Sequence, residues 1–260
     1  MTTTLLACKN ITYSYLSKFP ALDDVSINVI KGEKLALLGA NGSGKSSLLK
    51  LLNGLIFPQS GSYEAFGKIV TEENLEEEKF SHEFRSRIGF VFQNSDAQVF
   101  SPTVREEVAF GPLQFAIPNE EVNKRVDETL ELLGISNLAD RPPFQLSGGQ
   151  KKRVAIASIL IMNPEILLFD EPTAGLDPRT QEWLFQLIEE LSRRGKTIVT
   201  ATHELSYLNR IADRCLVFGE NHKIVSECTP SDLLANRRLL MDVNLIHPDT
   251  NLHFHSRESN

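Results

Sequence analysis

A glycine-rich segment near residue 40 has the residue types and the spacing of a phosphate-binding loop. It fits the pattern G-x-x-x-x-G-K-[ST] and comprises Gly39, Ala40, Asn41, Gly42, Ser43, Gly44, Lys45 and Ser46. Glycines let backbone N–H groups turn toward phosphate oxygens, and a following helix points its positive N-terminus at the same anion. We expect the Lys45 ammonium to reach the β- and γ-phosphates of a nucleotide and the Ser46 hydroxyl to bind Mg²⁺. The required context is present, because the apolar run Leu35–Leu38 precedes the segment and a predicted helix, Lys45–Asn53, follows it.

Two adjacent carboxylates follow a second apolar run. Ile166–Phe169 is followed directly by Asp170 and Glu171. An acidic side chain at the carboxyl end of a parallel strand faces the crevice in which α/β sheets bind ligands. Asp170 suits Mg²⁺, usually through a water molecule, and Glu171 suits polarising a water that attacks the γ-phosphate. The pattern alone also fits a solvated strand end, but the phosphate loop elsewhere in the chain favours the chemical role.

A second glycine-containing helix start lies between these two motifs. The residues Leu146-Ser147-Gly148-Gly149-Gln150 open a predicted helix, Gly148–Met162. The Ser147 side chain and the backbone of the two glycines form another helix N-terminus suited to an anion. One chain therefore has two predicted phosphate-binding helix starts.

Together, these motifs resemble those of the ATP-binding cassette (ABC) ATPases. Gly39–Ser46, with Ser47 after it, resembles the phosphate loop of that family, Leu146–Gln150 resembles its signature, and Asp170 with Glu171 resembles its Walker-B acid pair. The resemblance covers about residues 5–235. It implies that the chain hydrolyses ATP and uses ATP and Mg²⁺.

Four single residues match further positions of the family. Tyr15 resembles the aromatic residue that stacks on adenine, and Gln93 resembles the Q-loop glutamine. Asp177 resembles the D-loop aspartate, and His203 resembles the switch histidine. On this resemblance the catalytic residues are Glu171, His203 and Gln93, and the metal-binding residues are Ser46, Gln93 and Asp170.

Three of these single residues also have a plainer interpretation. Gln93 would suit the polar end of a strand, and His203 would suit a position packed beside Glu204. Tyr13 fits its predicted strand as well as Tyr15 does. Their order around two specific motifs favours the functional interpretation.

Family geometry implies a partner subunit. In ABC ATPases the signature of one subunit covers the nucleotide held by the phosphate loop of the other. Ser147, Gly149 and Asp177 would therefore act across an interface, with Gly148 and Gln150 on the same surface. We expect a homodimer, or a heterodimer with a sister ATPase, that closes around two ATP.

The segment after Gln93 narrows the subfamily. Asn94–Val104 and Val108–Pro112 resemble ATPases of energy-coupling-factor transporters, which import cobalt, nickel or vitamins. The basic run Lys151-Lys152-Arg153 also resembles them. The chain departs from the usual pattern at Ser95 and Ala97, where that family has proline and an acidic residue.

The resemblance implies that integral-membrane transporter subunits dock near Gln93–Pro112. The chain would then lie at the cytoplasmic face of the cell membrane as a peripheral protein. A soluble ABC ATPase that acts in assembly or repair without transport is the alternative. A different phosphate-loop enzyme, such as a nucleotide kinase, is disfavoured by the signature. The transported substrate cannot be read from these residues.

Composition excludes several other classes of protein. The chain has 260 residues, 41% of them hydrophobic, which excludes disordered and collagen-like classes. Its net charge of −7 argues against nucleic-acid binding. No apolar run approaches the ~20 residues of a membrane span, and no secretory signal is visible. Cys8, Cys215 and Cys228 form no CxxC pair, so we expect buried thiols rather than disulfides or a zinc site.

Alternation of strand-like and helix-like segments predicts an α/β fold. The resemblance implies a P-loop NTPase (RecA-like) core with an antiparallel β subdomain and an inserted helical signature subdomain at about 94–162. Predicted strands are Leu5–Tyr15, Val25–Ile30, Leu35–Leu38, Ile88–Gln93, Ile166–Phe169, Thr197–Ala201 and Cys215–Phe218. A further helix is predicted at Asn119–Gly134, where Glu120 can pair with Lys124 and Glu121 with Arg125 at i,i+4 spacing. Another predicted helix starts at Asp177, and a short one starts at Thr229.

Two segments are predicted to lie outside the packed fold. Thr71–Glu83 holds six glutamates and is predicted to be a solvated surface insertion. Residues 241–260 are predicted to be a polar, flexible tail with His253 and His255, beyond a single ABC domain at 5–240.

Overall fold

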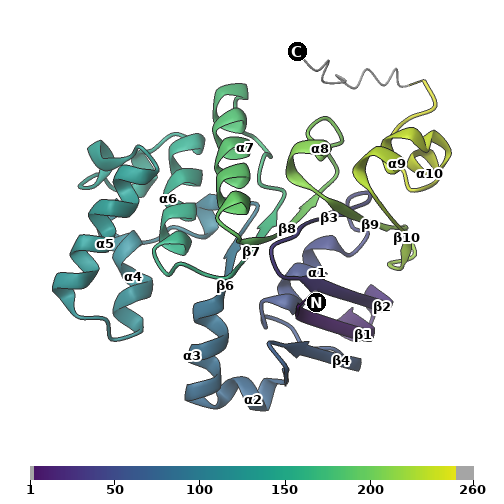
Figure 1. Cartoon of the computed structure of the whole chain (residues 1–260), viewed down its shortest axis with the longest axis horizontal. Coiled ribbons are helices and arrows are strands. Elements are labelled where there is room, and N and C mark those ends of the chain that lie inside the picture. Colours follow the sequence, from purple (N-terminus) through teal and green to yellow (C-terminus); the bar gives the residue numbers. More distant parts are fainter. Residues whose placement is uncertain (1–2, 250–260) are drawn as a thin grey trace.

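A mostly parallel six-stranded sheet forms the centre of the computed structural model, which describes residues 3–249 (Figure 1). The strand order is β10-β9-β3-β8-β7-β6, in which only β10 is antiparallel to its neighbour. Every residue of β6, β7 and β8 is buried, as expected for strands covered on both faces. The strands are β3 (Lys34–Leu38), β6 (Ile88–Val91), β7 (Ile166–Asp170), β8 (Thr197–Thr202), β9 (Arg214–Phe218) and β10 (Ile224–Cys228).

A second sheet of four antiparallel strands packs against the first around helix α1 (Lys45–Leu52). Its order is β2-β1-β4-β5, with β1 (Thr4–Tyr15), β2 (Phe19–Ile30), β4 (Ser60–Ala65) and β5 (Lys68–Ile69). Buried and exposed residues alternate along the second half of β2, as expected for a strand with one face in the core. The strands β4 and β5 were not predicted, because their residues are small or polar and lack a clear period.

The predicted helical subdomain is present as α4 (Val104–Gln114), α5 (Asn119–Leu132) and α6 (Gly148–Leu160), which lie together at one end of the molecule (Figure 1). One apolar face of α5 is buried and consists of Val122, Val126, Leu130 and, just after the helix, Leu133. Arg125 pairs with Glu121 as predicted, whereas Lys124 lies within 4.0 Å of Glu128 and not of Glu120. Helix α4 was not predicted.

The remaining helices cover the sheet and the C-terminal part of the chain. They are α7 (Pro178–Arg193), α8 (Leu208–Ile211), α9 (Pro230–Ala235) and α10 (Arg237–Asp242). Asp177 and Thr229 cap α7 and α9 as predicted, each by accepting a hydrogen bond from a backbone N–H three residues on. In the part of the chain that the structure describes, no helix has the length and apolar character needed to cross a bilayer.

The acidic segment 71–83 is not a solvated insertion. It forms α2 (Glu72–Glu76) and most of α3 (Glu78–Arg87), and its Leu75, Phe80 and Phe84 are buried in the core between the two sheets. The glutamates dominate the composition, but the few apolar residues are spaced so that one face of each helix packs inward.

The predicted tail also begins too early. Val243 and Ile246 are buried with Leu233 and Leu240 in a cluster against β3 and β9, so the packed region includes the first residues after 240. Residues 250–260, including His253 and His255, lie outside the described residues.

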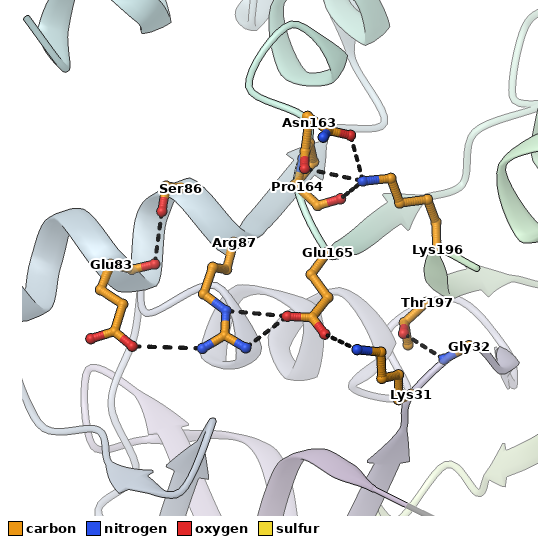
Figure 2. Close-up of polar contacts among 10 residues, drawn as sticks. All are labelled: Lys31, Gly32, Glu83, Ser86, Arg87, Asn163, Pro164, Glu165, Lys196 and Thr197. Atoms are coloured by element: carbon orange, nitrogen blue, oxygen red, sulfur yellow. Dashed lines mark hydrogen bonds and ion pairs between the residues drawn. The ribbon is translucent and has the colours of Figure 1, made fainter. Parts of the chain in front are cut away.

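A polar network ties the two sheets together at the end of the parallel sheet opposite the phosphate loop (Figure 2). Arg87 donates to Glu165 Oε2 from Nε and Nη2 at 3.2 and 2.7 Å, and Lys31 Nζ lies 3.2 Å from Glu165 Oε1. Burial acts to raise the pKa of Glu165, but hydrogen bonds from Arg87 and Lys31 outweigh it and hold that pKa below its ordinary value of 4.5. The carboxylate therefore joins α3, β7 and the β2–β3 turn.

Replacing Glu165 with glutamine should lower the free energy of unfolding by about 1–2 kcal/mol at neutral pH, because two cationic partners lose their carboxylate. The folded protein keeps Glu165 ionised at a pH where the unfolded chain has taken up the proton. The stabilisation is thus present above pH 4.5 and is lost as the pH falls through the folded-state pKa. Denaturant unfolding of the wild type and of Glu165→Gln, at several pH values from 7 to 3.5, measures the difference in their free energies of unfolding.

The control is Glu121→Gln, which removes the partner of one exposed arginine on α5. A stability difference for Glu165→Gln that stays constant across that pH range would contradict the assignment.

Candidate nucleotide-binding and hydrolysis site

The phosphate loop joins β3 to α1 and its shape depends on glycine at position 44. Gly44 has φ +116° at the N-cap of α1, a conformation that residues with a Cβ rarely adopt. A Cβ on Gly44 would lie 2.3 Å from the carbonyl oxygen of Ala21 on β2. The loop is therefore packed against the antiparallel sheet, and this close approach holds it in place.

Lys45 is the buried cation of the loop, with 4% of its surface exposed. Its ammonium donates to the carbonyl oxygens of Gly39 and Ala40 at 2.7 and 3.0 Å and lies 3.7 Å from Glu171 Oε1. Burial lowers the pKa of Lys45, while the charges of Glu171 and Asp170 act in the opposite direction.

Three oxygen-bearing side chains meet where β7 ends beside the loop. Ser46 Oγ donates to Asp170 Oδ1 at 2.7 Å, which brings together two of the three side chains predicted to hold the metal, the third being Gln93. Burial, supported by the charge of Glu171, raises the pKa of Asp170 despite the hydrogen bond from Ser46. The hydroxyl and the carboxylate come from segments 124 residues apart in the chain.

Glu171 is held in an unusual backbone conformation. Its φ is +41°, which is rare for a residue with a Cβ and costs of order 1–3 kcal/mol. Its Oε1 lies 2.9 Å from His203 Nδ1, which donates to it when Nδ1 carries the proton. Its Oε2 is buried and has no hydrogen-bond partner among the described residues. The strained turn thus aims one carboxylate oxygen of Glu171 at His203 and leaves the other unpaired.

A cleft of about 510 Å³ opens over these groups. Of the predicted site residues, it is lined by Tyr15, Asn41, Gly42, Gly44, Lys45, Ser46, Ser47, Gln93 and Glu171. Tyr15 and Ser47 are joined by their hydroxyl groups at 3.2 Å, so the tyrosine is attached to α1 at one side of the cleft. Pro20 and Ala21 also line it and were not predicted, since they reach the cleft only through the β1–β2 pairing.

The signature residues do not line this cleft. Ser147 is the N-cap of α6, and its hydroxyl and the Gln150 side chain form a reciprocal capping box. Asp177 accepts hydrogen bonds from the backbone and the hydroxyl of Thr180, and a Cβ on Gly149 would lie 2.7 Å from that same hydroxyl. The starts of α6 and α7 are therefore adjacent, and Ser147, Gly148, Gly149, Gln150 and Asp177 belong to one surface apart from the cleft.

Comparison with known proteins agrees with this geometry. Residues 22–174 match the ABC transporter family. The chain is 46% identical over 230 residues to the nickel import ATP-binding protein NikO of Rhodobacter capsulatus, covering 87% of this chain and 90% of that protein. It is 41% identical over 246 residues to the energy-coupling factor transporter ATP-binding protein EcfA of Methanothermobacter thermautotrophicus, covering 95% and 78%.

Two solved structures have the same fold. The cbiO1 protein of Clostridium perfringens, part of the ABC transporter complex cbiONQ, matches with a TM-score of 0.78 and 37% identity, over 94% of this chain and 96% of that one. A dimeric ATP-binding cassette, MJ0796, bound to ADP and Pi after hydrolysis, matches with a TM-score of 0.76 and 33% identity, over 87% and 99%. The chain belongs to the ABC transporter family and is one of its ATP-hydrolysing subunits.

Substituting Gly44 with alanine should abolish tight ATP binding. The new Cβ would meet a backbone oxygen at 2.3 Å in addition to the strain of a positive φ, so the loop must move. We expect the dissociation constant of a fluorescent ATP analogue to rise at least about tenfold, which is a loss of about 1.4 kcal/mol.

The matched control is Gly67→Ala, at φ +80° with nothing within 4 Å of the new Cβ. That variant should lose only the folding stability that alanine costs at a positive φ, and it should bind the analogue as the wild type does. Equal binding by both variants would contradict a steric requirement at position 44.

Proposed function

We propose that this chain is the ATP-hydrolysing subunit of an energy-coupling-factor importer that carries cobalt or nickel ions or a vitamin. The observation that supports it best is the convergence of the phosphate loop, Glu171 and Gln93 at one cleft, with Asp170 and His203 in hydrogen-bond contact with the lining residues Ser46 and Glu171. The similarity to a nickel import protein, to an energy-coupling factor protein and to a member of a cbiONQ complex supports the transport class.

Mg²⁺ would fit beside the phosphate loop. Ser46 Oγ and Asp170 Oδ1 are hard oxygen donors 2.7 Å apart, and such donors, completed by phosphate oxygens and water, are what Mg²⁺ prefers. The buried, unpaired Ser43 Oγ and Glu171 Oε2 offer further polar atoms to a ligand in the cleft. The ion would neutralise charge on the phosphates during hydrolysis. We infer that Ser46, Asp170 and Gln93 hold it.

In this proposal Glu171 is the group that polarises the attacking water. Its carboxylate is buried, and the contact of Oε1 with His203 restricts its orientation. The ammonium of Lys45 lies 3.7 Å from Glu171 Oε1 and would stabilise negative charge that develops in the cleft. Tyr15, at the side of the cleft, would stack on the adenine ring.

The signature surface supports an arrangement in which two chains complete each other's sites. Ser147, Gly149 and Asp177 lie at two adjacent helix starts that are held by capping contacts, and none of them lines the chain's own cleft. A helix N-terminus with exposed backbone N–H groups suits the phosphates of a nucleotide held by another chain. The dimeric cassette to which this chain is similar supports such a pairing, either with a second copy or with a sister ATPase.

Glu171→Gln should lower kcat at least about a hundredfold while ATP binding is kept, because the amide has the shape of the carboxylate but cannot act as a base. A dimer with bound ATP should then accumulate, and the mass obtained by sedimentation should be twice that of a single chain. Single-turnover hydrolysis and analytical ultracentrifugation with ATP measure both effects.

Glu204→Gln is the control, since Glu204 follows the same strand as His203 but does not line the cleft. Retention of the full ATPase rate by Glu171→Gln would remove Glu171 from this role.

An exposed aromatic surface supports a membrane partner near Gln93–Pro112. Phe100 is 68% exposed and meets the half-exposed Phe110 edge to face at 5.1 Å, and Leu113 is also exposed. The surface lies on the segment that resembles energy-coupling-factor ATPases. It would attach the chain as a peripheral protein on the cytoplasmic face of the membrane, and the net charge of −7 gives no support to a nucleic-acid partner.

The double substitution Phe100→Ser with Phe110→Ser should reduce co-purification with integral-membrane subunits at least about tenfold, because it removes two exposed aromatic anchors. Its ATPase rate in isolation should stay within about twofold of the wild-type value. Quantitative pull-down from detergent-solubilised membranes measures the loss.

Leu132→Ser, at an equally exposed apolar site on α5, is the control and should bind as the wild type does. If the wild-type chain captures no integral-membrane protein, the transport proposal fails and a soluble ABC ATPase in assembly or repair replaces it.

A further inference from the structure

The three basic residues that follow the signature each hold a different part of the protein. Lys151 forms an ion pair with Asp96, in the segment after Gln93. The Arg153 guanidinium lies over the Trp183 ring of α7, 4.2 Å from its centroid. Between them, Lys152 points into the interior. Helix α6 is therefore anchored on several sides within its first two turns.

Lys152 is one of the most buried side chains of the protein, with 2% of its surface exposed. Its Nζ donates to the main-chain carbonyl oxygens of Phe92 and Gln93 at 3.1 and 3.0 Å. A buried ammonium is costly unless its N–H groups are satisfied, and here the acceptors are two successive carbonyls rather than a carboxylate. The ammonium thus fixes the backbone at the point where the chain leaves β6.

The same stretch is fixed from its other side. The Gln98 side chain accepts a hydrogen bond from the Phe92 N–H at 3.0 Å and donates to the Phe90 carbonyl at 3.2 Å. These contacts occupy the open edge of β6, which is the last strand of the sheet. With Lys152 on its carbonyls, the main chain of Phe92 and Gln93 has little freedom, and the Gln93 side chain extends from it into the cleft.

We propose that Lys152 is the positioning residue of Gln93, so that the helix beginning at the signature sets where this glutamine lies in the chain's own nucleotide site. The inference rests on the proposed role of Gln93 in binding Mg²⁺ and in catalysis. Lys152 touches no nucleotide in this account and acts only through the backbone that carries Gln93.

The structure offers a lysine of matching chemistry away from the cleft. Lys196, at the start of β8, donates to the carbonyl oxygens of Asn163 and Pro164 at 3.0 and 2.6 Å (Figure 2). It fixes the turn before β7 at the opposite end of the sheet. A merely structural role for Lys152 predicts a loss of stability without a specific effect on the nucleotide site, whereas a positioning role predicts that Lys152, unlike Lys196, affects that site.

The test uses the full chain carrying Lys152→Met, Gln93→Ala, both substitutions, or Lys196→Met. We measure binding of a fluorescent ATP analogue with and without Mg²⁺, and kcat for ATP. Loss of support behind a metal-binding group typically costs 10–100-fold in metal affinity. Lys152→Met should therefore raise the Mg²⁺ concentration for half-maximal binding about tenfold or more and lower kcat, while binding without Mg²⁺ stays within about twofold. Lys196→Met should leave all three quantities within about twofold.

The double variant decides the mechanism. If Lys152 acts through Gln93, the double variant is no worse than Gln93→Ala alone. Additive losses, or an effect of Lys152→Met no larger than that of Lys196→Met, overturn the inference and leave the role of Gln93 intact. If Gln93→Ala itself behaves as the wild type does, both the inference about Lys152 and the proposed role of Gln93 are overturned. Should Lys152→Met fail to fold, Lys152→Gln, which keeps an N–H donor, enters the same cycle with a smaller expected loss.

Discussion

Parallel pairing of four strands is the constraint on which the site depends. Leu38 of β3 pairs with Thr202 of β8, Asp170 of β7 pairs with Ala201, and Val91 of β6 pairs with Phe169. The carboxyl ends of these strands therefore lie at nearly the same level of the sheet. Each strand is followed by a different chemical group: the phosphate loop, the acid pair, the histidine and the glutamine. No local stretch of the sequence forms the site, because only the register of the sheet brings these groups together.

Burial of the charged groups is the second consequence of that register. The ammonium of Lys45 and the carboxyl of Asp170 are both withdrawn from water, and burial shifts the pKa of the lysine down and that of the aspartate up. Carbonyl oxygens and a serine hydroxyl compensate only part of this desolvation. The cleft thus carries oriented charges in a medium of low dielectric constant, where they act more strongly on a phosphate than they would in water. The positive φ of Glu171 shows that the fold also accepts backbone strain to aim its carboxylate.

The groups that can be predicted from the sequence are those whose motif is local. The phosphate loop, the acid pair after Ile166–Phe169 and the capped start of α6 are each contained in a few consecutive residues, and the structure has them on the expected elements. The contact of Glu171 with His203 joins residues 32 positions apart and could be placed only by family resemblance. Pro20 and Ala21 reach the cleft through strand pairing alone, so no local pattern marks them.

Elements with weak periodicity were the ones missed. β4 consists of the residues SGSYEA, of which only Tyr63 and Ala65 are buried, and it is a strand because β1 pairs with it. The segment 71–83 is highly charged overall, yet Phe80 and Phe84 decide where it lies. In both cases tertiary packing decides the structure, and the local composition gives no indication of it. The burial of Lys152 was not predicted either, because the run Lys151-Lys152-Arg153 does not indicate which side chain points inward and only the fold shows it.

The cleft is divided between two parts of the chain that are held in different ways. The phosphate loop, Asp170, Glu171 and His203 extend from strands that share backbone hydrogen bonds, so they move only with the sheet. Gln93 leaves the edge strand β6 and is held from the side of α6, by Lys152 on its carbonyl and by Lys151 through Asp96. The aromatic pair Phe100 and Phe110 lies in the following segment and α4. A displacement of the helical subdomain would thus change the position of Gln93 while the acids and the loop stay in register. In the proposed function, a partner at the aromatic pair and a nucleotide at Ser147 would therefore both act on the element that holds this glutamine.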